Sequence, residues 1–385
     1  MLPFTHPLWL VGFRPFFTLA CLAGMAMPVL WALLFSGVIS AKALPVSPLQ
    51  WHAHEMYFGF GWAVMGGFLL TSTKNWVGIR GYHGGVLAAI AATWLIERAW
   101  FWVGGDLPRP LFLAGAHLFL ASLVALLLWT LIRHRATDNY RRDNFFFLIL
   151  LPAFLLAKAL LLSETYTAAG YHLTQGLFRL AFLVMLERTL TQFMQSAFAV
   201  AIFRHPLLDN AIKALALLYA FVGAFLPAAW LALALAALLL IRFARWSPHL
   251  AFIRLDIGIM YLGYLALVAQ LLLDFAAAVA TPNWVGNLPV HVFTFGVMGL
   301  IIPAMLIRIC NGHTGRKVQF DRRDKAVLWI MLAAFVCRII LPQIFPSLYL
   351  RWIDLAATGW LAAFALLAWR YLPYLWQPRV DGREH

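Results

Sequence analysis

The sequence predicts an all-α polytopic membrane protein, a bundle of about twelve transmembrane helices, and three observations lead to that class. Of its 385 residues, 63% are hydrophobic and 11% are charged, with a mean hydropathy of +0.82, whereas soluble domains carry about a quarter of charged residues. Apolar runs of about 16 to 26 residues, long enough to cross a bilayer as helix, recur along the chain. No long polar segment interrupts them, so we expect one transmembrane domain over residues 1–385.

The apolar runs place the predicted spans in chain order. The first run is longer than the apolar core of a cleaved signal peptide, about 7 to 15 residues, and is therefore kept as a span. Spans seven and eight are short and share one apolar stretch around Pro227. The predicted spans are Phe16–Ile39, Trp51–Thr71, Gly85–Val103, Leu111–Leu131, Phe145–Leu162, Leu173–Phe193, Ala211–Pro227, Ala228–Arg242, Leu255–Ala280, Pro289–Arg308, Ala326–Ile344 and Leu350–Trp369.

The basic residues indicate the topology. Alternate connections hold most of the Lys and Arg, and the intervening ones hold only Lys42, Arg109 and Arg351. The positive-inside rule then predicts cytoplasmic N- and C-termini. Because the net charge of +14 is divided among short loops rather than gathered in a stripe, no nucleic-acid partner is expected. The three cysteines lack CxxC spacing, so neither a disulfide framework nor a structural zinc site is indicated.

Five of the twelve histidines fall in the outer third of even-numbered predicted spans. Imidazole is a common metal ligand and the axial ligand of many haems. Any one of these histidines alone is better explained as an interfacial residue bonded to water or headgroups. Together they predict an internal polar or metal site, and the candidate metal ligands are His52, His54, His117, His172 and His291.

The stretch "WHAHEM" opens predicted span two. Residues two apart on a helix point to nearly opposite sides, so His52 and His54 cannot bind one metal from a regular helix. We predict that His54 faces His291 of span ten across a haem, with Glu55 accepting the remaining N–H of a ligating imidazole. The alternative is that "WHAH" is extended outside the helix and only His54 enters the bundle.

Charged residues within the predicted spans need partners. For Arg98 and Arg179 near the outer histidines, pairing with acidic residues of other helices is the preferred interpretation, and binding of haem propionates, whose carboxylates suit a guanidinium fork, is the alternative. Gly59 and its neighbours allow either a haem face or another helix to approach closely. The candidates for proton carriage are Glu55, Glu97, Glu187 and Tyr261.

The loop "CNGHTGRKVQFDRRDK" after predicted span ten combines a Gly-rich turn with a run of basic residues. It predicts a helix stop followed by cations that bind lipid headgroups. Its glycines are too few and wrongly ordered for a phosphate-binding Walker loop, so nucleotide binding is not expected.

At these residues the chain resembles the NnrS family, membrane proteins of the bacterial nitric oxide response described as containing haem and copper. The motifs that carry the resemblance are "WHAHEMYFGFGWAVMGGFLLTSTKNW", "HVFTFGVMGLIIPAMLIRICNGHTGR" and "PRVDGREH", which reach from near one end of the chain to the other. The positions that match the family's polar positions are His52, His54, Glu55, His291, His313 and Arg316.

The resemblance implies a haem-bearing bundle, comparable in outline to the catalytic subunits of haem–copper oxidases and nitric oxide reductases. Haem of the b type is the cofactor it implies first, with His172, Arg98 and Arg179 as further candidates around it. Copper is the weaker expectation, because oxidase-like copper sites take three histidines from spans six and seven, and these spans offer His172 alone. Tyr261 stands where the family is expected to have a histidine, which weakens any second centre there.

The sequence therefore predicts a multi-pass protein of the bacterial inner membrane that binds, senses or helps remove nitric oxide or its iron adducts at a haem near the outer face. Oxidoreductase activity on nitric oxide is left open as an alternative to binding or sensing alone, and the electron donor is unknown. The alternative is a copper or other metal transport or delivery protein without haem chemistry. A bundle that only partners another complex is a third reading.

Overall fold

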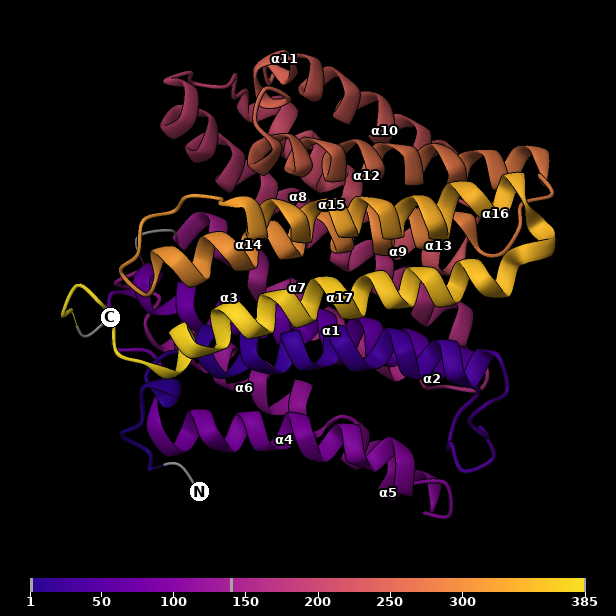
Figure 1. Cartoon of the computed structure of the whole chain (residues 1–385), viewed down its shortest axis with the longest axis horizontal. Helices are drawn as coiled ribbons and strands as arrows, with labels where there is room; N and C mark the ends of the chain where they lie inside the picture. The colour runs from indigo at the N-terminus through magenta and orange to yellow at the C-terminus, as the bar shows by residue number, and fades with distance from the viewer. Residues whose placement is uncertain (1–2, 139–140, 384–385) are drawn as a thin grey trace. The chain divides into compact units, whose positions relative to one another are not determined.

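The computed structural model describes residues 3–138 and 141–383, except for the side chains of residues 74–75 and 141–143. Over these residues the chain is helical and contains no strand (Figure 1). It forms two compact units. Unit 1 comprises residues 1–170, 306–319 and 364–385, and unit 2 comprises residues 171–305 and 320–363.

Unit 1 is built from the N-terminal segment, residues 1–170, and the ends of two later helices. The second predicted span is interrupted by a π-helix, η2, between α2 and α3. The helices that begin in this unit are η1 (Pro7–Trp9), α1 (Phe13–Phe35), α2 (Pro48–His54), η2 (Glu55–Gly61), α3 (Trp62–Val77), α4 (Gly84–Val103), α5 (Arg109–Ala116), α6 (Leu118–Arg133), α7 (Arg141–Leu161) and α8 (Thr167–Phe198).

Unit 2 contains most of α8 and the helices that follow it. Two further π-helices, η3 and η4, interrupt the helical segments that include His291 and Arg338. The remaining helices are α9 (Pro206–Phe225), α10 (Ala229–Ala244), α11 (Pro248–Ala251), α12 (Leu255–Ala280), α13 (Leu288–His291), η3 (Val292–Met298), α14 (Gly299–Gly312), α15 (Arg322–Phe335), η4 (Val336–Ile340), α16 (Leu341–Ile344), η5 (Pro346–Leu348) and α17 (Tyr349–Trp376).

The helices bear out a multi-pass membrane protein. Helix lies over each predicted span, and the break between spans seven and eight falls at Pro227 as predicted. Within the described residues eight helices are long and apolar enough to cross a bilayer, or nine if the bent pair α5 and α6 is one span. The all-helical class is confirmed, while twelve spans, cytoplasmic termini and a single domain stay predictions.

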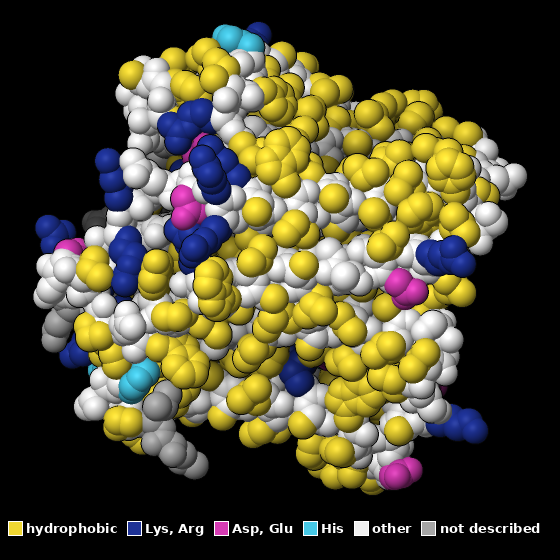
Figure 2. Space-filling view, in the orientation of Figure 1, with side chains coloured by type: hydrophobic (Ala, Val, Ile, Leu, Met, Phe, Trp, Pro, Cys, Tyr) yellow, Lys and Arg dark blue, Asp and Glu magenta, His cyan; other side chains and the backbone are white. Residues whose placement is uncertain are grey.

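The surface of the units is as apolar as a lipid environment requires. Large side chains such as Trp129, Leu207 and Trp230 are 63%, 75% and 71% exposed. Hydrophobic side chains cover most of the visible face in Figure 2. Extensive exposed apolar surface is rare on soluble monomers, so these faces suit contact with acyl chains.

Candidate functional site

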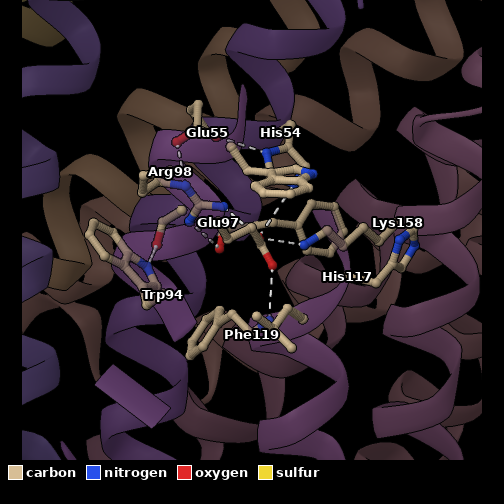
Figure 3. Close-up of polar contacts among 12 residues, drawn as sticks. His54, Glu55, Trp94, Glu97, Arg98, His117, Phe119 and Lys158 are labelled. Carbon is tan, nitrogen blue, oxygen red and sulfur yellow. Dashed lines mark hydrogen bonds and ion pairs between the residues drawn. The ribbon is translucent and has the colours of Figure 1, made fainter. Parts of the chain in front are cut away.

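A group of five charged or titratable side chains lies inside unit 1, and we call it the His54 cluster: His54, Glu55, Glu97, Arg98 and Lys158 (Figure 3). They come from α2, η2, α4 and α7. Their side chains are between 0% and 8% exposed. The cluster contains two carboxylates and two cations, so its net charge is zero when the histidine is neutral. Buried charges need such compensation by opposite charges.

The start of α2 determines where His54 lies. Ser47 and Gln50 form a reciprocal capping box, and Pro48 occupies the first turn, where its missing N–H costs nothing. Trp51–His54 is consequently helical, so the extended alternative for "WHAH" is wrong. His54 is fully buried, whereas His52 is half-buried and stacks on Trp31 with ring centroids 4.1 Å apart.

The His54 imidazole is oriented by its neighbour. Its Nδ1 lies 2.9 Å from Glu55 Oε1, and its ring lies 4.1 Å from that of Phe101. Because a carboxylate only accepts, Nδ1 carries the hydrogen and Nε2 keeps its lone pair. Nε2 has no hydrogen-bond partner and lies 3.7 Å from Glu97 Oε1. Glu55 thus accepts an N–H from His54, while a role of that histidine as a ligand stays a prediction.

Glu97 is the centre of the cluster. Its Oε1 accepts from Lys158 Nζ at 2.6 Å and from Arg98 Nη2 at 2.5 Å, and its Oε2 accepts from the backbone N–H of Phe119 at 3.1 Å. Arg98 also pairs through Nε with Glu55 Oε2 at 2.8 Å. Glu97 therefore links α4, α6 and α7 through charge-assisted contacts.

Gly59 in η2 lets Arg98 approach the helix. A Cβ at position 59 would lie 3.0 Å from Glu55 Oε2 and 3.2 Å from Arg98 Nη1. Trp94 Nε1 donates to the carbonyl of Gly59 at 3.0 Å, so α4 is held against this π-helical turn. Such turns occur frequently at functional sites. Gly66 and Gly67 instead face side chains of α6 and α1, which is close helix packing.

His117 lies beside the cluster at the break between α5 and α6, where the helix axis bends by 47°. Its Nδ1 donates to the carbonyl of Leu113 at 2.8 Å, and its buried Nε2 has no hydrogen-bond partner. It interacts electrostatically with Glu97 and Lys158. His54 and His117 thus share the arrangement of metal-binding histidines, one N–H fixed by an oxygen and the other nitrogen left as a lone pair.

His291 belongs to unit 2, at the end of α13, and is half-buried. Its Nδ1 donates to the carbonyl of Asn287 at 2.7 Å, and Arg338 Nη2 donates to its Nε2 at 3.0 Å. Arg338 Nη2 also lies 3.3 Å from the hydroxyl of Tyr349. Because His54 is in unit 1, the predicted pairing of His54 with His291 stays a prediction.

The remaining predicted ligands differ in their surroundings. His172 is exposed on α8. Arg179 donates to Gln270 Oε1 at 3.0 Å and pairs with Asp274 Oδ2 at 3.4 Å. Arg98 and Arg179 both form ion pairs, which agrees with the pairing alternative, and their role on a haem propionate stays a prediction. In the described part of the chain, no three His, Cys, Asp or Glu side chains are placed together as a metal site.

Sequence reasoning identified the members of the His54 cluster one by one but not their association. Lys158 and Glu97 are 61 residues apart, and no spacing connects them. The only signal in the sequence was that a charged residue within a membrane span needs a partner. This rule does not identify the partner.

No curated protein matches the chain. The family model described as NnrS protein matches residues 7–379, which is nearly the whole chain. Together with the multi-pass helical structure, this match shows that the chain belongs to the NnrS family.

Proposed function

We propose that this membrane protein of the nitric oxide response binds haem through His291 and binds, senses or helps remove nitric oxide or its iron adducts there. Membership of the NnrS family supports a membrane protein of the nitric oxide response. The observation that carries the haem assignment is the imidazole of His291, half-buried and held by a backbone carbonyl through Nδ1.

With its neighbours in these positions, His54 is a poor candidate for an axial haem ligand. It is fully buried, the Phe101 ring covers its face, and Glu97 Oε1 is 3.7 Å from Nε2. A porphyrin over Nε2 would need the volume that Glu97 and Lys158 fill, and both of these side chains are 0% exposed. We therefore assign His54 no axial role.

His291 fits the role better. The carbonyl of Asn287 accepts from Nδ1, which leaves Nε2 as the ligating atom. Arg338, now 3.0 Å from Nε2, would move off that nitrogen, and its planar fork matches a propionate carboxylate. The haem would supply an iron to which nitric oxide binds. Arg338 and Tyr349 would remain as hydrogen-bond donors beside it.

The second candidate function is metal transport or delivery without haem, and a separate observation favours it. His54 and His117 each keep Nε2 without a hydrogen-bond partner inside unit 1, with Nδ1 fixed by Glu55 and Leu113 respectively. Imidazole nitrogens suit copper and similar ions. A small ion needs far less volume than a porphyrin, so these two nitrogens are its best candidates.

The test is the reduced-minus-oxidised visible spectrum of the purified full-length protein, with and without nitric oxide, together with metal analysis. We expect a haem signal that His291→Ala removes, that His54→Ala keeps, and that nitric oxide alters. His205→Ala is the matched control because His205 is exposed in a loop. A wild-type protein with copper and without haem would overturn the proposal and favour metal delivery through His54 and His117.

A further inference from the structure

Three arginines of unit 1 interact beside the start of α1 and the ends of α14 and α17: Arg14, Arg316 and Arg379. Arg14 stands in the first turn of α1 and is 0% exposed. Its Nη1 donates to the carbonyl of Leu375, in the last turn of α17, at 2.9 Å. The same Nη1 donates to the carbonyl of Gln377, the first residue after that helix, at 2.6 Å. Its Nε and Nη2 have no hydrogen-bond partner.

Two motifs that the proposed function does not use supply the other arginines. Arg316, from "GHTGR", lies over the Tyr374 ring at 3.7 Å and donates through Nη1 to Thr314 Oγ1 at 2.9 Å. Arg379, from "PRVDGREH", donates through Nη1 to the carbonyl of His313 at 3.0 Å. The N–H of Val380 donates to the carbonyl of Thr314 at 3.1 Å, which joins the two motifs.

The charges of this group do not balance. Arg316 and Arg379 both interact with Arg14 as like charges. Asp381 pairs with Arg379 at 2.9 and 2.5 Å and is the only carboxylate in contact with the three arginines among the described residues. The Arg379 guanidinium holds the pKa of Asp381 well below its ordinary range, so this carboxylate is charged and neutralises one cation. Among the residues that the structure describes, two positive charges of this group are left.

Uncompensated guanidinium groups beside a membrane are costly, and an anion that accepts their N–H groups removes the cost. Phosphate is the anion that a guanidinium fork matches best, and phosphate headgroups are abundant at the ends of membrane helices. We propose that Arg14, Arg316 and Arg379 form a binding site for a phosphate group, either free phosphate or the headgroup phosphate of an anionic lipid. Arg316 and Arg379 contact the ligand, while the buried Arg14 supplies positive charge beside them.

The experiment measures the thermal unfolding midpoint of the full-length protein in neutral detergent. The probe is inorganic phosphate, compared with sodium chloride at the same ionic strength. We expect phosphate to raise the midpoint by about 3 °C. Arg316→Gln should abolish this rise, whereas Lys317→Gln, which removes the same charge from an exposed neighbour, should retain it. Arg379→Gln serves as the second variant if Arg316→Gln fails to fold.

A second arm identifies the source of the phosphate. The protein is placed in lipid nanodiscs of phosphatidylcholine alone or with phosphatidylglycerol, and the same midpoint is measured. A rise from phosphatidylglycerol that depends on Arg316, with no rise from inorganic phosphate, assigns the site to a lipid headgroup. A rise from inorganic phosphate alone assigns it to the free anion. If neither probe produces a rise that depends on Arg316 or Arg379, the proposal is wrong.

Discussion

Each unit contains a cluster of buried ion pairs, and the two clusters are built differently. The His54 cluster of unit 1 balances two carboxylates against two cations, and its side chains are at most 8% exposed. The cluster of unit 2, which we call the Glu187 cluster, sets Glu187 and Asp209 against three cations, and two of these are 38% and 29% exposed. Its cations are Arg204, Lys213 and Arg242.

The difference indicates two roles. In the Glu187 cluster several cations surround each carboxylate, so each contact is partly redundant, and the described group includes no imidazole. In the His54 cluster a single carboxylate, Glu97, receives both Lys158 and Arg98, and a histidine nitrogen beside it has no hydrogen-bond partner. We interpret the Glu187 cluster as structural, whereas the His54 cluster also holds an imidazole nitrogen that has no hydrogen-bond partner.

The largest expected effect comes from Glu97→Gln. It leaves Lys158 buried without its carboxylate, and breaking a buried pair in this way costs about 3–5 kcal/mol of stability. The thermal unfolding midpoint and denaturant stability of the purified protein measure the loss.

Two controls sharpen that result. Glu164→Gln removes an exposed carboxylate and should change the stability little. Adding Lys158→Met to Glu97→Gln removes the stranded cation and should restore more than half of the lost stability. A double variant no more stable than Glu97→Gln would contradict the central role of Glu97.

A smaller effect is expected from Arg242→Met in the Glu187 cluster. Arg242 is 1% exposed, contacts Glu187 Oε2 at 3.3 Å and donates to the hydroxyl of Tyr264 at 3.1 Å. Glu187 keeps Arg204 and Lys213, so we expect a loss of about 1–3 kcal/mol from hydrogen bonds to a charged group. The same unfolding measurement applies. A loss as large as that of Glu97→Gln would remove the contrast between the clusters.

The smallest effect is expected from Arg204→Ala. Its guanidinium contacts Glu187 at 2.5 Å and Asp209 at 2.8 Å, but its side chain is 38% exposed and solvent screens these pairs. The expected loss is about 0–1 kcal/mol, and it should shrink further in high salt. Unfolding at two salt concentrations checks it, and a loss that salt does not reduce would show that Arg204 acts as a buried charge.

The sequence named individual residues of the candidate site but not most of their partners. Glu55 was expected to orient a ligating histidine, and it lies 2.9 Å from His54 Nδ1 because the two residues are adjacent in one helix. The contact of Lys158 with Glu97 was not predicted, since it depends on how α4 and α7 pack. The π-helical turn at Glu55–Gly61 has no clear sequence signal beyond its glycines.

By itself the sequence determined the helical class, the membrane environment, the family and the titratable residues that a bilayer protein must partner. These conclusions follow from the composition, from the length of the apolar runs and from the motifs, all of which are read directly from the order of residues. Only the tertiary structure decided which charge contacts which, which imidazole nitrogen lacks a hydrogen bond, and that Glu97 and Phe101 lie against His54. Those results depend on distances between helices, and spacing along the chain does not encode them.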